Sequence, residues 1–449
     1  MSLIDKIFDA GIVGCGGAGF PTHVKLSGGA EHLIINGAEC EPLLRTDRTL
    51  MVNFADRLVS AAEKIRAEIG ASVCTFGLKE SYRAEIDVLN GAISGMGLTD
   101  TVKLLTFTSF YPAGDEHVLV REVTRKTVPP GGLPLDVGCV VLNVSTLLCV
   151  YDALDGRPFT DKYLTLTGEV KEPSVLRVPL GTAFTACIER AGGVKCSDYI
   201  VVSGGPMMGT VMTAEQAAEA AVTKTTSGII VLKGDSYMAN REKISVRHML
   251  NRARSACIQC SYCTQLCPRF LMGHPLEPHK IMRKIALAGS LDGLLGDADI
   301  RRAVLCCECG VCETVACPMD LQPRRVNAIL KKTLAEAGIR YPKGENSGAE
   351  SPMREYRKIP SKRAAVRAGV GSYYEYRITE IKSFEPQRVT LPLKQHIGVP
   401  CKPIVESGER VTKGQLIARC PQGKLGVNLH ASMDGTVTVC GDAITIEEG

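Results

Sequence analysis

The cysteines of this chain are concentrated in one stretch, where their spacing suits metal chemistry. Nine of the 19 cysteines lie between Cys257 and Cys317. The first four form a C-x-x-C-x-x-C-x-x-x-C-P run, and they are Cys257, Cys260, Cys263 and Cys267. Runs of this kind bind 4Fe-4S clusters, and in two-cluster ferredoxins the fourth cysteine ligates the other cluster. A second run is therefore expected.

A second run does follow, with one extra residue before its last cysteine. Its members are Cys306, Cys309, Cys312 and Cys317, and Pro318 comes next. Crossed ligation predicts two 4Fe-4S clusters, because each run then lends its last cysteine to the other. The two predicted ligand sets are Cys257, Cys260, Cys263 and Cys317, and Cys306, Cys309, Cys312 and Cys267. The adjacent Cys307 leaves an alternative open, in which it replaces Cys306.

Two zinc ribbons are the competing interpretation, because C-x-x-C pairs also bind zinc tetrahedrally. Zinc takes four ligands and has no use for a third cysteine at the same spacing, whereas eight thiolates suit two clusters. Residues 276–288 and 321–337 have apolar side chains at helical spacing beside the runs. The sequence therefore favours an α-helical dicluster module.

A glycine-rich segment is the second candidate site. Residues 14–19 read Gly-Cys-Gly-Gly-Ala-Gly, and the backbone N–H groups of such a loop can approach a phosphate closely. A Rossmann site needs a strand before the loop and a helix directly after it. Here residues 3–10 have helical spacing and Pro21 follows the loop, so a standard dinucleotide fold is not expected. A simple glycine turn is the alternative.

Four segments, in their order along the chain, resemble a known family. They are GCGGAGFPTHVK at 14–25, INGAECEP at 35–42, YPAGDE at 111–116 and LNVSTL at 142–147. They are similar to the FMN- and NADH-binding subunit of complex I and, more closely, to the C subunit of Rnf-type electron-transport complexes. With a dicluster module following, the chain most resembles the cobalamin reductases of propanediol-utilisation microcompartments, over essentially its whole length.

The resemblance implies FMN as cofactor, NADH as hydride donor and cobalamin as electron acceptor. It implies that the FMN phosphate is bound by Gly14, Gly16, Gly17, Gly19 and Lys25. Asn36, Glu39 and Asn143 are expected to contact the flavin and its ribityl chain. The remaining wall beside the flavin and the hydride donor is expected to contain Glu41, Tyr111, Gly114, Asp115 and Glu116. Phe20, stacked on the nicotinamide, and Glu116 are thus the candidate catalytic residues.

Three positions depart from the complex I pattern. Cys15 replaces an arginine, Ala38 an aspartate and Leu142 an asparagine, and these departures bear on NADH more than on FMN. Asp115 and Glu116 also have a simpler interpretation as the acidic start of a helix, because acidic side chains favour helix N-termini.

The expected fold is multidomain, mixed α/β and α+β. By resemblance, a complex I-type FMN/NADH-binding α/β domain occupies 1–158 and a soluble-ligand-binding β-grasp (SLBB) domain occupies 159–238. The dicluster ferredoxin module covers 239–340, a basic linker 341–384 and a barrel-sandwich hybrid domain 385–449. Whether the β-grasp domain binds a corrinoid or braces the clusters stays open.

Composition limits the remaining possibilities. A length of 449 residues suggests about three domains. A net charge of +5 is too balanced for a dedicated nucleic-acid binder. The N-terminus lacks the pattern of an export signal, and the most apolar stretch, 137–150, is too short to span a bilayer. We therefore expect a cytoplasmic protein without a transmembrane segment.

These features together predict an NADH-dependent oxidoreductase, in which FMN converts the two electrons of a hydride into single electrons for the clusters. The family further implies an adenosyltransferase and shell proteins as partners, inside a bacterial microcompartment. One rival is the electron-entry subunit of an Rnf-like membrane complex. The other is a noncatalytic iron–sulfur relay or scaffold.

Overall fold

The first unit of the computed structural model is a parallel sheet covered on both faces by helices. The structure describes residues 2–288, 292–345 and 347–449. The sheet has the order β3-β2-β1-β5. Its strands are β1 (His32–Asn36), β2 (Val73–Lys79), β3 (Val102–Phe107) and β5 (Cys139–Asn143).

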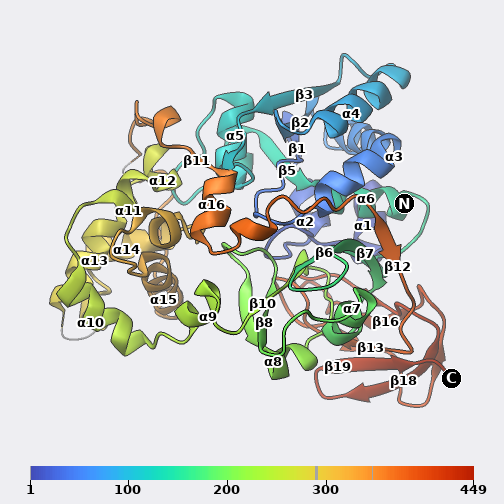
Figure 1. Ribbon diagram of the computed structural model, residues 1–449. Coiled ribbons are helices and arrows are strands. Elements are labelled where there is room, and N and C mark those ends of the chain that lie inside the picture. Colours follow the sequence, from blue (N-terminus) through green and yellow to red (C-terminus); the bar gives the residue numbers. More distant parts are fainter. Residues whose placement is uncertain (1, 289–291, 346) are drawn as a thin grey trace.

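The helices of this unit divide between the two faces of the sheet (Figure 1). They are α1 (Leu3–Asp9), α2 (Thr22–Leu26), α3 (Thr46–Glu68), α4 (Arg83–Gly95), α5 (Glu116–Thr124) and α6 (Val144–Leu154). Leu33 and Ile35 of β1 pack with α3 and α6, whereas Ile34 packs with α5. Both faces are buried, which explains why the central residues of β1 and β5 are apolar.

The second unit is a mixed six-stranded sheet of order β12-β7-β6-β10-β8-β9. Its strands are β6 (Asp161–Gly168), β7 (Ser174–Pro179), β8 (Tyr199–Ser203), β9 (Thr210–Thr213), β10 (Gly228–Lys233) and β12 (Ile381–Ser383). The short helices α7 (Phe184–Arg190) and α8 (Ala214–Ala218) accompany it, and Phe184 and Cys187 of α7 are buried against the sheet.

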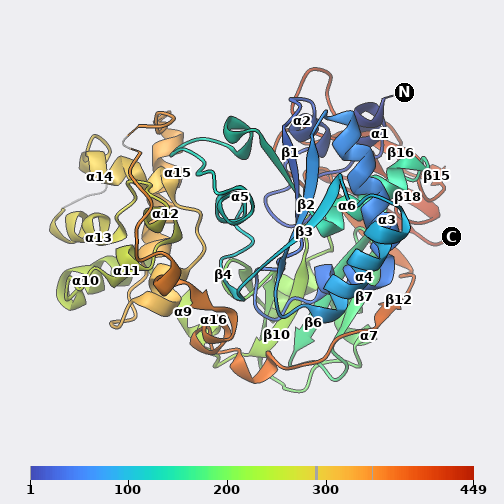
Figure 2. The same cartoon turned by 90° about the horizontal axis from the view of Figure 1, so that it is seen from above.

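The cysteine-rich region is a compact group of short helices at one side of the molecule (yellow in Figures 1 and 2). They are α9 (Tyr237–Glu242), α10 (Val246–Ala256), α11 (Tyr262–Gln265), α12 (Pro268–Leu271), α13 (Pro278–Leu287), α14 (Ala298–Arg301) and α15 (Pro323–Glu336). Residues Val311–Ala316 form a π-helical turn. Buried residues of α10, α13 and α15 share one core with Cys267 and Cys306.

The described part of residues 341–384, which we expected to be a linker, is folded onto the rest of the chain. Strand β11 (Ile359–Pro360) pairs with β4 (Phe110–Tyr111), and β12 extends the second sheet. Helix α16 (Ser361–Arg367; orange in Figure 1) buries Ala364 and Ala365 completely. The sequence did not reveal this packing because the buried side chains are few and small, so no apolar periodicity marks them.

The C-terminal unit consists of two small sheets, of order β13-β19-β18-β15 and β14-β16-β17. Their strands are β13 (Arg388–Pro392), β14 (Lys402–Pro403), β15 (Arg410–Val411), β16 (Leu416–Arg419), β17 (Leu429–His430), β18 (Gly435–Cys440) and β19 (Ala443–Glu447). Their apolar residues continue the core of the parallel-sheet unit. Within the described residues, no helix is long and apolar enough to cross a membrane.

Candidate functional site

Two of the predicted flavin-contacting residues meet at the carboxyl edge of the parallel sheet. Asn36 ends β1, Asn143 ends β5, and the two are register partners on neighbouring strands. The chain leaves β1 toward β2 on one side, whereas β5 lies on the other side. Ligands of open α/β sheets bind at such a switch point, outside the carboxyl ends of the strands.

The glycine loop lies against this edge. A Cβ atom added to Gly16 would come within 2.9 Å of the Asn143 side chain, whereas Gly17 faces open space. The N–H of Cys15 donates to the Thr146 hydroxyl at 2.9 Å, which anchors the loop on α6. The loop thus presents bare, exposed backbone beside Asn143, which fits a phosphate-bearing cofactor such as FMN.

Lys25 and Glu116, predicted for separate roles, form an ion pair with each other. Lys25 Nζ lies 2.5 Å from Glu116 Oε1, joining α2 to the start of α5. Phe20, at the end of the glycine loop, is 38% exposed. A side chain in that position is available to a ligand approaching from solvent.

A buried acidic network continues inward from the sheet edge. Glu39 accepts hydrogen bonds from the N–H groups of Asp47 and Arg48 in the first turn of α3. Asp47 accepts from the Asn143 amide at 2.6 Å. Burial and the neighbouring Asp47 raise the pKa of Glu39 to about 7. Sequence reasoning missed Asp47, which follows INGAECEP by only a few residues but belongs to none of the motifs.

The YPAGDE segment reaches the same edge through its glycine. The Asn36 amide donates to the Gly114 carbonyl at 2.9 Å, and a Cβ on Gly114 would lie 2.9 Å from that of Cys40. Gly114 therefore lies against Asn36, and its contact with the flavin stays a prediction.

Three other predicted flavin residues contact neighbouring units: Tyr111 and Asp115 contact the cysteine-rich unit, and Glu41 contacts the second, six-stranded unit. The Tyr111 hydroxyl donates to the carbonyl of Cys309 at 2.7 Å. Glu41 accepts from the N–H of Met207 at 2.9 Å. Asp115 caps α5 and pairs with Arg269 at 2.9 Å. These side chains join the units, and Arg269 was missed although it follows Cys267-Pro268 directly.

The eight predicted ligand cysteines fall into two groups, each lining its own small cavity. One cavity is lined by Cys257, Cys260, Cys263 and Cys317, which we call the first-run site. The other is lined by Cys267, Cys306, Cys309 and Cys312, which we call the second-run site. Cys267 and Cys317 have thus exchanged places, as crossed ligation requires. Cys307 also lines the second-run site, so the structure brings both alternative ligands to it.

The surroundings of both sites fit thiolates. The N–H groups of Glu308 and Leu321 point at the sulfurs of Cys306 and Cys317, each at 3.3 Å. Arg269, Arg324 and Asn327 line the second-run site and supply further N–H donors. Donors and positive charge of this kind stabilise a cysteine-ligated cluster, whose potential depends on hydrogen bonds to its sulfurs.

A single metal ion fits these positions poorly. Four thiolates around one zinc at about 2.3 Å must nearly touch one another. Among the described residues, no three His, Cys, Asp or Glu side chains lie close enough together to coordinate one ion. Two separate groups of four cysteines therefore favour two cubanes over the zinc-ribbon alternative.

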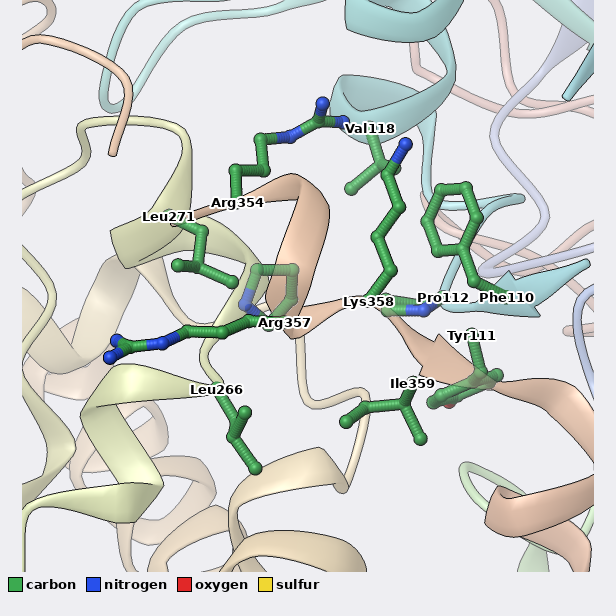
Figure 3. A pocket seen from close by; sticks show the side chains of 11 residues that line it. Phe110, Tyr111, Pro112, Val118, Leu266, Leu271, Arg354, Arg357, Lys358 and Ile359 are labelled. Atoms are coloured by element: carbon green, nitrogen blue, oxygen red, sulfur yellow. The ribbon is translucent and has the colours of Figure 1, made fainter. Parts of the chain in front are cut away.

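An apolar pocket marks the place where three segments meet (Figure 3). It is lined by Phe110, Tyr111, Pro112, Val118, Leu266, Pro268, Leu271, Arg354, Arg357, Lys358 and Ile359. Its cations are already engaged, because Arg354 and Lys358 pair with Glu122 and Arg357 donates to the Gln265 carbonyl. The pocket therefore belongs to the joint between the units.

Comparison with known proteins agrees with this architecture. Four protein-family models match successive parts of the chain: the Nuo51 FMN-binding domain at 7–152, the SLBB domain at 163–211, the 4Fe-4S dicluster domain at 256–322 and the RnfC barrel sandwich hybrid domain at 374–448. The chain is 39% identical to the cobalamin reductase PduS of Salmonella typhimurium, over 99% of this chain and 96% of that protein. The chain belongs to the cobalamin reductase PduS family.

Other members and more distant relatives fit the same assignment. The PduS of Citrobacter freundii is 37% identical over 100% of this chain and 97% of its own length. The C subunit of the proton-translocating ferredoxin:NAD(+) oxidoreductase complex of Clostridium ljungdahlii is 34% identical, over 60% of this chain and 56% of that protein. The family resemblance, the fold class and the oxidoreductase class predicted from the sequence are thereby confirmed.

Proposed function

We propose that this family member transfers electrons from NADH, through FMN and two 4Fe-4S clusters, to cobalamin. The observation that carries the proposal is the direct joint between the predicted flavin edge and the second-run site, made by Tyr111 with Cys309 and by Asp115 with Arg269. When bound, FMN takes up a hydride and releases its electrons one at a time, and 4Fe-4S clusters carry single electrons. Full-length relatives named cobalamin reductases support cobalamin as the acceptor.

Residues of the sheet edge are assigned to the flavin. The glycine loop with Lys25 holds the phosphate, and Asn36, Glu39 and Asn143 orient the ring and ribityl chain. Phe20 and Glu116 remain the candidates for positioning the nicotinamide. Phe20 is partly exposed beside the glycine loop, and Glu116 pairs with Lys25 of α2. Holding donor and acceptor rings in one orientation is how such a site accelerates hydride transfer.

The two cysteine sites are assigned different places in the path. The second-run site adjoins the parallel-sheet unit, with Tyr111 and Cys309 in a common core. The first-run site lies beside a loop whose Ile258 and Tyr262 are 61% and 52% exposed. We therefore assign entry to the second-run site and exit to the first-run loop, where an acceptor can approach.

The biological setting is proposed on the family resemblance alone. It implies that the protein supplies reduced cobalamin to an adenosyltransferase and works with shell proteins in a propanediol-utilisation microcompartment. The match to Rnf C subunits over 60% of the chain supports the second candidate, an electron-entry role in an Rnf-like complex.

Anaerobic NADH titration of the protein reconstituted with FMN, iron and sulfide tests the proposal. We expect flavin bleaching together with a reduced-cluster EPR signal, followed by reoxidation of the clusters when cob(II)alamin or cob(III)alamin is added. Bleaching without reoxidation by cobalamin would reject the acceptor and favour the Rnf-like role. Bound FMN that NADH leaves oxidised would reject NADH as the donor.

A further inference from the structure

Helix α15 buries one polar side chain on a face that is otherwise apolar. The buried residues of this helix are Pro323, Val326, Asn327, Leu330 and Leu334. Asn327 is 1% exposed, and among the described residues neither its Nδ2 nor its Oδ1 atom has a hydrogen-bond partner of normal geometry. An unpaired buried amide destabilises a protein, and such groups are rare in native folds. The position therefore indicates a partner that the polypeptide does not supply.

The Asn327 side chain lines the second-run site, beside the cysteines of that site. Burial raises the pKa of the Cys306 thiol and the Asn327 side chain opposes that rise, which agrees with an amide close to this sulfur. The N–H of Glu308 points at the same sulfur at 3.3 Å. An anionic group attracts the N–H end of an amide and repels its carbonyl end. A thiolate-ligated cluster therefore has the charge and the place that the missing partner requires.

The first-run site provides an internal comparison. Helices α13 and α15 each begin at a proline, Pro278 and Pro323, and each follows the end of a cysteine run. The fifth residue of α13 is Met282, which is 2% exposed and lines the first-run site. The fifth residue of α15 is Asn327, which lines the second-run site. Matched positions thus carry a thioether, which has no N–H to donate, at one site and an amide at the other.

The arginines of the second-run site differ from Asn327 in their surroundings. Arg269 pairs with Asp115 at 2.9 Å, and Arg324 pairs with Glu313 at 3.1 Å. Their N–H groups can still donate, but a carboxylate beside each guanidinium offsets its charge. The Asn327 amide adds a donor that no neighbouring carboxylate opposes.

We propose that the Asn327 amide donates an N–H to a sulfur of the cluster bound at the second-run site and thereby raises the reduction potential of that cluster. Reduction adds one electron to the cluster, and no covalent bond forms or breaks. The donor stabilises the reduced state more than the oxidised state, because the reduced state carries one more negative charge. The inference rests on the proposed function, which assigns a cluster and the entry of electrons to this site, and a higher potential there favours transfer from the flavin edge.

Redox titration followed by EPR tests the proposal on the full-length protein reconstituted with FMN, iron and sulfide. Dithionite and redox mediators set the solution potential, so the measurement needs neither NADH nor cobalamin. Cys260→Ser identifies the EPR signal of the second-run cluster. In Asn327→Met, which copies Met282, the oxidised-to-reduced ratio of that cluster at a fixed potential should rise about tenfold, as expected for one lost hydrogen bond. For one electron, this is a fall of about 59 mV in midpoint potential.

A control variant and a spectroscopic signature separate this role from a purely structural one. Met282→Leu exchanges one apolar side chain for another and should shift neither cluster, and Asn327→Met should leave the first-run cluster unchanged. In the natural protein, labelled with heavy nitrogen in its asparagine side chains, electron–nuclear double resonance should detect a nitrogen coupling to the reduced second-run cluster. Asn327→Met should lack this coupling.

Each result decides one point. An unchanged midpoint potential in Asn327→Met would overturn the proposal, and so would the absence of a nitrogen coupling in the natural protein, which can be measured even if the variant does not assemble its cluster. If both expected results appear in a protein whose clusters NADH cannot reduce, the proposed function alone is contradicted.

Discussion

Individual side chains at the joint serve the connection between units more than the flavin. Asp115 both caps α5 and pairs with Arg269, and the two side chains are only 14% and 9% exposed. The sequence indicated an acidic residue at a helix start, but the direction of its carboxylate depends on an arginine more than 150 residues away. Residue type was therefore predictable here, whereas the partner was not.

Breaking the Asp115–Arg269 ion pair should destabilise the protein. Removing one partner of a buried ion pair leaves an uncompensated charge, so we expect Arg269→Ala to lower the free energy of unfolding by about 3 kcal/mol. The surface pair Arg388–Glu447, with side chains 63% and 56% exposed, provides the matched control. Arg388→Ala should change stability by less than about 1 kcal/mol. Denaturant unfolding measures the stability of both variants. Equal losses of stability in Arg269→Ala and Arg388→Ala would contradict a stabilising role of the Asp115–Arg269 pair.

Glu41 should make stability depend on pH. Burial raises its pKa to about 7 from the usual 4.5, against the lowering effect of the Met207 and Met208 N–H groups. The folded state therefore holds a proton that the unfolded chain releases near 4.5. The stabilisation is complete below that pH and is lost as the pH rises through about 7.

Glu41→Gln should flatten this dependence. The free energy of unfolding, measured between about pH 5 and about pH 8, should fall more in the natural protein than in the variant, by a difference of order 3 kcal/mol at most. Glu448→Gln, at an exposed position, should leave the slope unchanged. An unaltered slope in Glu41→Gln would assign the pH dependence to other groups.

At the scale of elements, the glycine loop was predictable because glycine spacing is local information. Its place above Asn143 follows from the parallel pairing of β1 with β5, which the apolar strands only suggest. Segment 341–384 was not predictable, because α16 becomes buried only against β4 and the π-helical turn, which are remote in sequence. A basic, alanine-rich stretch carries no sign of such partners.

The two central glycines should separate folding from cofactor binding. Gly16→Ala places a methyl group against Asn143, so we expect a loss of about 1–3 kcal/mol in the protein without FMN. Gly17→Ala meets open space and should change that stability by less than about 0.5 kcal/mol. Its methyl group should nevertheless lower FMN affinity about tenfold by occupying the space before the loop. Unchanged affinity in fluorescence titrations of Gly17→Ala would place the phosphate elsewhere.

Helix α16 should hold segment 341–384 against the rest of the chain. Ala364 is fully buried, so Ala364→Asp introduces an unpaired charge and should destabilise the segment by roughly 3 kcal/mol. Limited proteolysis should then cut within 341–384 faster than in the natural protein. Val366→Ala, at a side chain that is 58% exposed, should leave the cutting rate unchanged. Equal rates in both variants would show that the segment is held by other contacts.

For the whole molecule, the kinds of unit could be predicted from local motifs and resemblance, but their arrangement could not. The C-terminal unit and the parallel-sheet unit share one apolar core although they lie at opposite ends of the sequence. Figure 2 shows the cysteine-rich helices beyond α5 and β4, so the parallel sheet meets them through those elements. That arrangement gives the two cysteine sites unequal positions, which cysteine spacing alone cannot reveal.

Unequal positions predict unequal effects of losing either site. Because Cys309 adjoins Tyr111 while Cys260 borders the exposed loop, the second-run site lies between the flavin edge and the first-run site. In Cys260→Ser, NADH should still reduce the remaining second-run cluster. In Cys309→Ser, NADH should bleach the flavin but leave the remaining first-run cluster oxidised, because electron transfer slows steeply with distance.

Iron analysis must show about half of the natural content in both variants, as one lost 4Fe-4S cluster of two requires, and Cys440→Ser serves as the intact control. Rapid reduction of the first-run cluster in Cys309→Ser, followed by freeze-quench EPR, would show that electrons enter at the first-run site and that the proposed order is reversed.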